Sequence, residues 1–226
     1  MPITANNTQI TFNDNTRQVT AYPTAAVQNR IMRVYEGPSV TANTTGTWPK
    51  PTGLKGIQVT VVGGGNRGGR GTPGVPTPSN FNQAFGGGGA GGTAIRYYPA
   101  PSIPGPQPYR AGGAANTSSF GVAPLTVISA TAGNTGTAFS GGTGGIGTNG
   151  DINIRGGSGG RAANLISGLY NGGVGGMSSL GGGGASGSDG NKYGGGGGGA
   201  SGCGIPGIPN SFGLGGVGVV IIEEYY

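Results

Sequence analysis

Alternation of apolar and polar side chains marks a few short segments of the chain. Ile57, Val59 and Val61 are separated by Gln58 and Thr60, and this period of two predicts a strand over 57–62. The last ten residues are β-branched and aromatic, which predicts a closing strand over 217–226. Shorter runs of the same kind predict further strands at 9–12, 18–22 and 31–35.

Glycine divides the chain into two parts. The chain holds 57 Gly in 226 residues, and only four of them precede residue 63. Because interior Gly costs a helix ~1 kcal/mol relative to Ala, the composition excludes a helical fold. A collagen triple helix is excluded as well, since no three-residue repeat runs the length of the chain. The expected fold class is all-β and irregular, with essentially no α-helix.

Gly-rich sequence without a repeat is often disordered, but three features indicate a folded region here. Apolar residues such as Phe120, Ile128 and Ile146 recur among the glycines. Residues 141–161 keep a local three-residue phase, as in a polyproline-II-like helix with three residues per turn. The region also ends in a strand that needs a partner. We therefore expect strands near 57–62 and 217–222 to pair and frame a bundle of polyproline-II-like segments.

The phase at 141–161 is too long for one straight pass through a compact domain. It would span ~65 Å at ~3.1 Å per residue. Asn149-Gly150 is a typical turn dipeptide near its middle. The sequence therefore predicts two passes joined at 149–150.

Composition and charge disfavour most catalytic chemistry. The chain has no His, one Cys and six acidic residues, so we expect no enzyme, no metal site and no cofactor. The net charge of +6 is spread out and does not indicate nucleic-acid binding. The glycine pattern at 63–68 and the Arg-Gly-Gly segment at 67–71 are weak nucleotide and RNA signals, because no helix follows and only one copy is present. No apolar run has the length of a membrane span, and the N-terminus does not read as a signal peptide.

Five Pro-rich or aromatic interruptions lie between the glycine runs, at 73–85, 97–111, 161–171, 188–193 and 203–212. Each reads either as a plain connecting loop or as part of a recognition surface on a rigid base. Tyr, Asn, Ser and Gly are typical of adaptable binding loops. The candidate receptor-binding residues are the aromatic and basic side chains of these interruptions: Phe81, Tyr97, Tyr98, Tyr109, Arg110, Tyr170, Lys192, Tyr193 and Phe212.

Several segments resemble the glycine-rich domain of bacteriophage tail-fibre proteins. The stretch 46–55 (GTWPKPTGLK), followed by the strand at 57–62 and a glycine run, is similar to the opening of that domain. Further similar segments follow in the same order at 85–94, 117–121, 150–160 and 215–226. The set as a whole also resembles the distal adhesins of T-even-type phages, in which polyglycine-II helices form a sandwich and variable loops bind the bacterial surface.

This resemblance implies a role and a location. The chain is expected to be a tail-fibre tip adhesin, made in the host cytoplasm and incorporated into the virion. Its expected partners are other tail or fibre proteins and a host outer-surface protein or lipopolysaccharide, with no nucleic acid; association as a homotrimer is left open. Residues 1–44 are expected to form a strand-rich attachment or oligomerisation segment, and 45–226 the glycine-rich receptor-binding domain.

Three other functions remain open. A purely structural virion component would share the composition but would bind no receptor. A glycine-rich ice-binding protein would show flat, regular rows of small side chains. A polysaccharide-degrading fibre enzyme would need two carboxylates ~5–9.5 Å apart.

Overall fold

The structure is a computed structural model that describes residues 29–39, 42–70, 84–164, 170–200 and 211–226. It also describes three short strands near the N-terminus, which form a small antiparallel sheet: β1 (Thr4–Asn6), β2 (Gln9–Thr11) and β3 (Arg17–Gln18). The fold is all-β. Within the described residues the helical element is a single 3-10 turn, η1 (Ala100–Ser102).

Two five-stranded antiparallel sheets form a β-sandwich. The first sheet has the strand order β11 (Gly147–Thr148), β10 (Ile128–Ala130), β9 (Ser118–Phe120), β8 (Gln107–Gly112) and β5 (Asn43–Trp48). The second has the order β12 (Ile152–Ile154), β7 (Thr93–Pro99), β6 (Gly56–Val62), β15 (Val219–Tyr225) and β4 (Arg30–Glu36). A separate pair joins β13 (Ala163–Asn164) and β14 (Tyr170–Asn171).

The hydrophobic core lies between these two sheets. Alternate residues of β6, Ile57, Val59 and Val61, are fully buried, as the sequence pattern predicts. Trp48 and Phe120 face them from the first sheet, with ring centroids 6.1 Å apart. The sandwich therefore has a conventional apolar core that does not depend on the glycines.

The predicted pairing of the two framing strands is confirmed. Strand β15 runs antiparallel to β6 in a register that places Val219 opposite Val62 and Tyr225 opposite Gly56. The other edge of β15 pairs along its whole length with β4. Strand β4 lies within residues 1–44, the expected attachment segment. Its pairing with β15 nevertheless makes it part of a sheet of the glycine-rich region.

The expectation that 97–111 is a connecting loop is wrong. Residues 93–99 form β7 and residues 107–112 form β8, so most of this interruption lies within the sandwich. The β-branched Ile95 and the aromatic Tyr97 and Tyr98 are a strand signal, but the prolines that follow at 99 and 101 favour a loop. The Asn149-Gly150 turn is confirmed, with Asn149 at φ +61°, and the strands on its two sides belong to different sheets.

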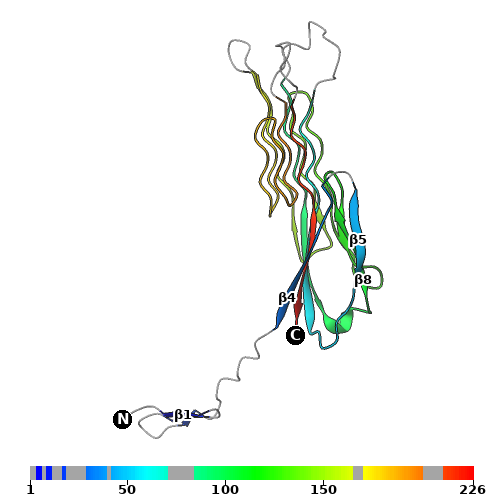
Figure 1. Cartoon of the computed structure of the whole chain (residues 1–226), viewed down its shortest axis with the longest axis vertical. Helices are drawn as coiled ribbons and strands as arrows, with labels where there is room; N and C mark the ends of the chain where they lie inside the picture. Colours follow the sequence, from blue (N-terminus) through cyan, green and yellow to red (C-terminus); the bar gives the residue numbers. More distant parts are fainter. Residues whose placement is uncertain are drawn as a thin grey trace.

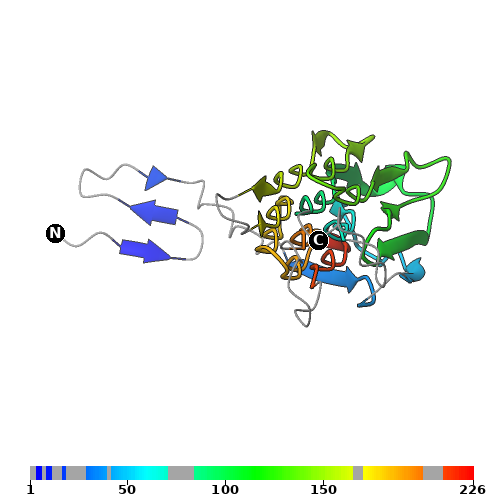
Figure 2. The same ribbon diagram turned by 90° about the horizontal axis from the view of Figure 1, so that it is seen from above.

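The glycine segments extend from one end of the sandwich as a bundle (Figure 1). Viewed along the bundle axis, they are seen as neighbouring coils (Figure 2). Residues 84–94 and 194–200 are buried without a break, so these two segments form the centre of the bundle. The other glycine segments surround them.

Hydrogen bonds of the central segment repeat every third residue. The amides of Gly86, Gly89 and Gly92 donate to carbonyls of segment 131–137. Gly87 and Ala90 donate to segment 157–160, and Gly88 and Gly91 to segment 194–197. The carbonyls of the same segment accept hydrogen bonds from the amides of three further segments, 63–69, 142–145 and 173–176. Segment 84–92 is therefore hydrogen-bonded to six neighbouring segments: 63–69, 131–137, 142–145, 157–160, 173–176 and 194–197.

Close approach of these segments requires glycine at the centre. A Cβ built on Gly88 would overlap the carbonyl oxygens of Asn66 and Arg67, and one on Gly196 would overlap that of Gly88. The obstructing atoms are backbone, which cannot rotate away as the end of a side chain can. The glycine content therefore follows from backbone-to-backbone packing, in which each segment satisfies the amides of its neighbours.

Candidate functional site

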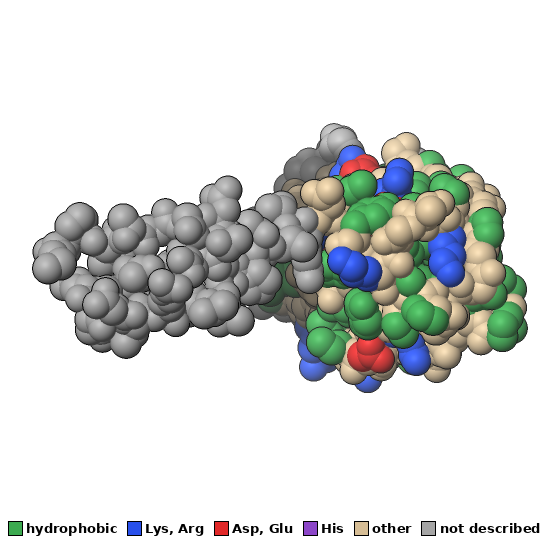
Figure 3. Space-filling view, turned by 90° about the horizontal axis from the view of Figure 1, so that it is seen from below, with side chains coloured by type: hydrophobic (Ala, Val, Ile, Leu, Met, Phe, Trp, Pro, Cys, Tyr) green, Lys and Arg blue, Asp and Glu red, His purple; other side chains and the backbone are tan. Residues whose placement is uncertain are grey.

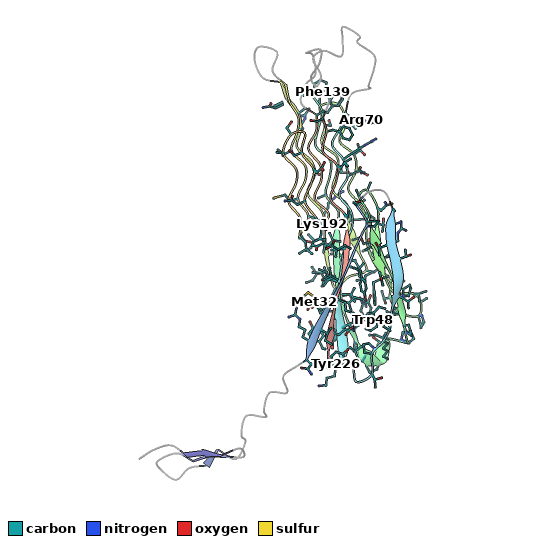
Figure 4. All side chains as sticks on the ribbon, viewed as in Figure 1. Met32, Trp48, Arg70, Phe139, Lys192 and Tyr226 are labelled. Carbon is teal, nitrogen blue, oxygen red and sulfur yellow. The ribbon has the colours of Figure 1, made fainter. Side chains whose placement is uncertain are left out.

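The candidate receptor-binding residues do not form one cluster. Tyr97, Tyr98, Tyr109 and Arg110 belong to the sandwich, and Lys192 and Tyr193 lie where the bundle meets it. Phe212 lies at the far end of the bundle, beside Arg70. Figure 4 shows this separation, with Lys192 at the junction and Arg70 and Phe139 at the far end. Phe81 and the side chain of Tyr170 lie outside the described residues.

Tyr98 is a core residue of the sandwich. It is 3% exposed, its hydroxyl donates to the Thr126 carbonyl at 2.7 Å, and its ring packs beside Phe120. Burial raises the pKa of the Tyr98 hydroxyl to about 12, so it stays protonated. Its neighbour Tyr97 points the other way and is 48% exposed, as expected for adjacent residues of a strand.

Tyr109 and Arg110 also serve the sandwich. Tyr109 stacks on Tyr35 with ring centroids 3.9 Å apart, which closes the gap between β8 and β4 at the side of the sandwich. Arg110 points outward from the first sheet, where its guanidinium faces the side-chain amide of Asn43. Neither side chain lies at the end of the bundle.

Lys192 and Tyr193 tie the bundle to the second sheet. Lys192 Nζ lies 2.8 Å from one carboxylate oxygen of Glu36, and the Tyr193 hydroxyl donates to the other at 2.6 Å. Hydrogen bonds from Lys192 and then Tyr193 hold the pKa of Glu36 below its ordinary value. These two residues therefore orient the bundle on β4, a role that a position in a Gly-rich loop does not reveal.

Arg67, Arg70 and Phe212 form the described cluster at the far end, which we call the tip cluster. The guanidinium carbons of Arg67 and Arg70 lie 6.0 and 5.2 Å from the centroid of the Phe212 ring. Both arginines are exposed, and their spacing of three residues places them on one side of their segment. Among the candidate residues from the sequence, Phe212 lies in this cluster, whereas the two arginines were not among those candidates.

Described residues of several segments meet beside this cluster. Gly69, Phe85 and Ala200 belong to three such segments. Bonds such as Ala200 N to Gly69 O and Phe85 N to Ala200 O hold these points together. Phe139 lies at the same end with a φ of +62° and 36% exposure. Three of the five predicted interruptions, at 73–85, 161–171 and 203–212, lie partly outside the described residues.

A cavity of about 230 Å³ lies in the sandwich, beside Tyr98. Arg96, Ser102 and Leu125 contribute to its lining. The Arg96 guanidinium is already engaged, since it donates to the Asn149 carbonyl at 2.8 Å and lies over the Tyr98 ring. The cavity therefore offers no free charged group for an anionic ligand.

Every described carboxylate has a partner within the chain. Glu36 is bonded to Lys192, Glu223 to Arg30 and Glu224 to Arg33. Asp151 and Asp189 accept from the backbone amides of Tyr97 and Leu214. Among the residues that the structure describes, no three His, Cys, Asp or Glu side chains are grouped as metal ligands would be. No helix in the same residues is long and apolar enough to cross a membrane.

Basic side chains are dispersed on the end of the sandwich. Figure 3 shows them separated by hydrophobic and uncharged side chains, without a continuous basic patch on the visible face.

Comparison with known proteins gives no matching family model and no curated protein with significant sequence similarity.

Proposed function

We propose that the protein is the receptor-binding tip of a bacteriophage tail fibre, an adhesin that contacts the host through the far end of its glycine bundle. The observation that carries this proposal is the tip cluster, in which two exposed arginines and Phe212 lie together at the far end of the bundle. The sandwich lies at the other end, where β4 brings the chain in from the N-terminal residues.

The bundle in this proposal consists of polyglycine-II helices. The three-residue period of hydrogen-bond partners along 84–92 supports it, because a helix with three residues per turn directs successive amides about 120° apart. Exposure repeats with the same period on the outer segment. Asn171, Val174 and Met177 are exposed, whereas the glycine pairs between them are buried.

A bundle of this kind suits recognition because it is stiff. Backbone hydrogen bonds in six directions hold each central segment, so the tip is ordered before the receptor arrives. Preorganisation lowers the entropy lost on binding. Loops on a rigid base can then vary in sequence without disturbing the fold.

The chemistry of the tip cluster suits an acidic or phosphorylated surface group. Arg67 and Arg70 offer guanidinium donors that pair with phosphates and carboxylates, and Phe212 supplies a rigid apolar contact. A host outer-surface protein or lipopolysaccharide provides such groups. Residues 1–28 would join the protein to other tail or fibre proteins, so that the particle presents the bundle outward.

Binding of the purified, labelled full-length protein to a panel of intact bacterial strains tests this function. We expect binding to a subset of strains, and at least a tenfold loss of affinity on replacing Arg67, Arg70 and Phe212 by Ala. A matched variant with Lys55 and Val122 replaced by Ala, both exposed on the sandwich, should bind as the wild type does. Absence of binding to every strain, or equal loss in both variants, would favour a purely structural virion component.

The other functions are less well supported. The outward residues of the described bundle include Arg67, Asn134, Arg155, Val174 and Met177, which form no flat, regular row of small side chains for ice. A polysaccharide hydrolase would need a free pair of carboxylates, and those described are engaged with partners.

A further inference from the structure

The outer faces of the two sheets differ sharply in polarity. In the first sheet one row of outward side chains crosses all five strands in register, and every member is polar: Thr45, Arg110, Ser119, Ser129 and Thr148. The matching row of the second sheet contains Val34, Ile221, Thr60, Ile95 and Ile152. Four of these five residues are β-branched aliphatic side chains.

This second row, which we call the aliphatic row, is not covered by the described part of the chain. Val34 and Ile152, at its two ends, are 46% and 55% exposed, and Ile221, Thr60 and Ile95 are half-buried. Met32 and Tyr97 extend the apolar surface on the next row and are 54% and 48% exposed. An antiparallel sheet with one face in water is expected to be polar on that face.

The bundle covers only the neighbouring row of the same face. Val62, Val219 and Thr93 are buried because Ser179 and the 192–194 turn lie over them. The apolar surface then continues beyond the sheet. Ile154 pairs with Thr93, and the Thr93 hydroxyl is hydrogen-bonded to Ser179 of the bundle. Close to Ser179 in the sequence, Leu180 and Met177 are 47% and 68% exposed. An apolar strip therefore runs along one side of the rod.

We propose that this strip is an interface with a second copy of the same chain. Its charges favour a like partner, because Arg30 and Glu223 on this face form an ion pair at 2.7 Å and leave no net charge to repel a copy. A surface that binds an anionic membrane would instead carry clustered Lys and Arg side chains. Five strands ~4.8 Å apart make the face of the sheet about 24 Å wide. The strip adds apolar surface beyond the sheet, which brings the total area toward the ~800 Å² per partner of a standard protein–protein interface.

The interface does not depend on the proposed receptor. It lies along the side of the rod, so association leaves the tip cluster free at the end. Copies related by a symmetry axis parallel to the bundle would present their tips side by side, which raises the avidity for a surface with repeated receptors. Failure of receptor binding and failure of self-association are therefore separate results.

Sedimentation velocity of the full-length protein over a hundredfold concentration range tests the proposal. The wild type should sediment as an assembly of two or more copies. Replacing Val34 and Ile152 by Lys should weaken association at least tenfold, whereas Lys at Thr45 and Thr148, the matching edge-strand positions of the first sheet, should leave it unchanged.

Thermal denaturation of both double variants checks that they fold, and Ile152→Thr gives a milder test on the same surface. A wild type that stays monomeric at every concentration would overturn the proposal, even if the strip then bound a different protein. Assembly that survives the Val34 and Ile152 changes, or that is lost equally in the control, would overturn it as well.

Discussion

Glu224 is a buried acidic residue of the closing strand β15. It is fully buried, yet its carboxylate accepts hydrogen bonds from Trp48 Nε1 at 2.7 Å, Arg33 Nε at 2.6 Å and the Tyr226 hydroxyl at 2.9 Å. Burial alone would raise the pKa of Glu224, but the bonds from Arg33, Trp48 and Tyr226 outweigh it and lower the pKa. The network joins β4, β5 and β15 across the edge of the sandwich.

Glu224→Gln should destabilise the protein by about 2–3 kcal/mol, because it leaves buried donors without a charged acceptor. This expected loss of stability is smaller than for a fully buried ion pair, because the Arg33 side chain is 41% exposed. Chemical denaturation measures the change. The adjacent Glu223→Gln is the control and should cost under about 1 kcal/mol, because the Arg30 side chain is 51% exposed. An equal loss of stability in the two variants would mean that the buried network stabilises the fold no more than the exposed Arg30–Glu223 ion pair does.

Acid should weaken the fold through Glu224 and Glu36, whose pKa values both lie below the ordinary 4.5. A carboxylate with a lowered folded-state pKa stabilises the protein above its unfolded-state pKa. That contribution is lost as the pH falls through the folded-state value. The melting temperature should therefore drop below about pH 4.5, and Glu224→Gln should flatten the drop. A wild-type melting temperature that stays constant to pH 2 would contradict this assignment.

At the scale of elements, the bundle segments depend on the absence of side chains at their contacts. Gly88→Ala should cost more than about 3 kcal/mol, because its Cβ would overlap backbone carbonyls on a neighbouring segment. Gly105→Ala is the matched control and should change stability by under about 1 kcal/mol, since no atom lies within 4 Å of its added Cβ. Thermal or denaturant unfolding compares the two. If Gly88→Ala were as stable as the control, the segments would not be packed this closely.

Alternation within a strand is local, and for that reason the sequence predicted β6 and β15 and their pairing. Strands β5, β8, β9 and β10 were not predicted, because their segments are short or interrupted by Gly and Pro and gain stability only by pairing. The same limit applies to the candidate site. Residue type marks Phe212, Tyr98 and Tyr193 alike as candidate binding aromatics, but the hydroxyls of Tyr98 and Tyr193 are engaged within the fold. Their difference is set by partners distant in sequence, Thr126 and Glu36.

At the scale of the whole molecule, the proposed function gives different tasks to the two ends of the protein. Deletion of residues 1–28 should leave a domain that folds, since the strands from β4 onward complete both sheets. The shortened protein should fail to join its virion assembly, which purification of particles and immunoblotting would detect. Normal incorporation would show that attachment lies elsewhere, for example on the aliphatic row.

The bundle and the tip cluster both require the glycine-rich region to be ordered. Hydrogen exchange of the full-length protein, followed peptide by peptide, tests this most directly. The central segments 84–94 and 194–200 should exchange slowly, with protection close to that of β6 and β15, because their amides are buried and bonded to neighbouring segments. Exchange of these segments at the rate of an unfolded chain, while β6 and β15 stay protected, would contradict the bundle and the tip that it supports.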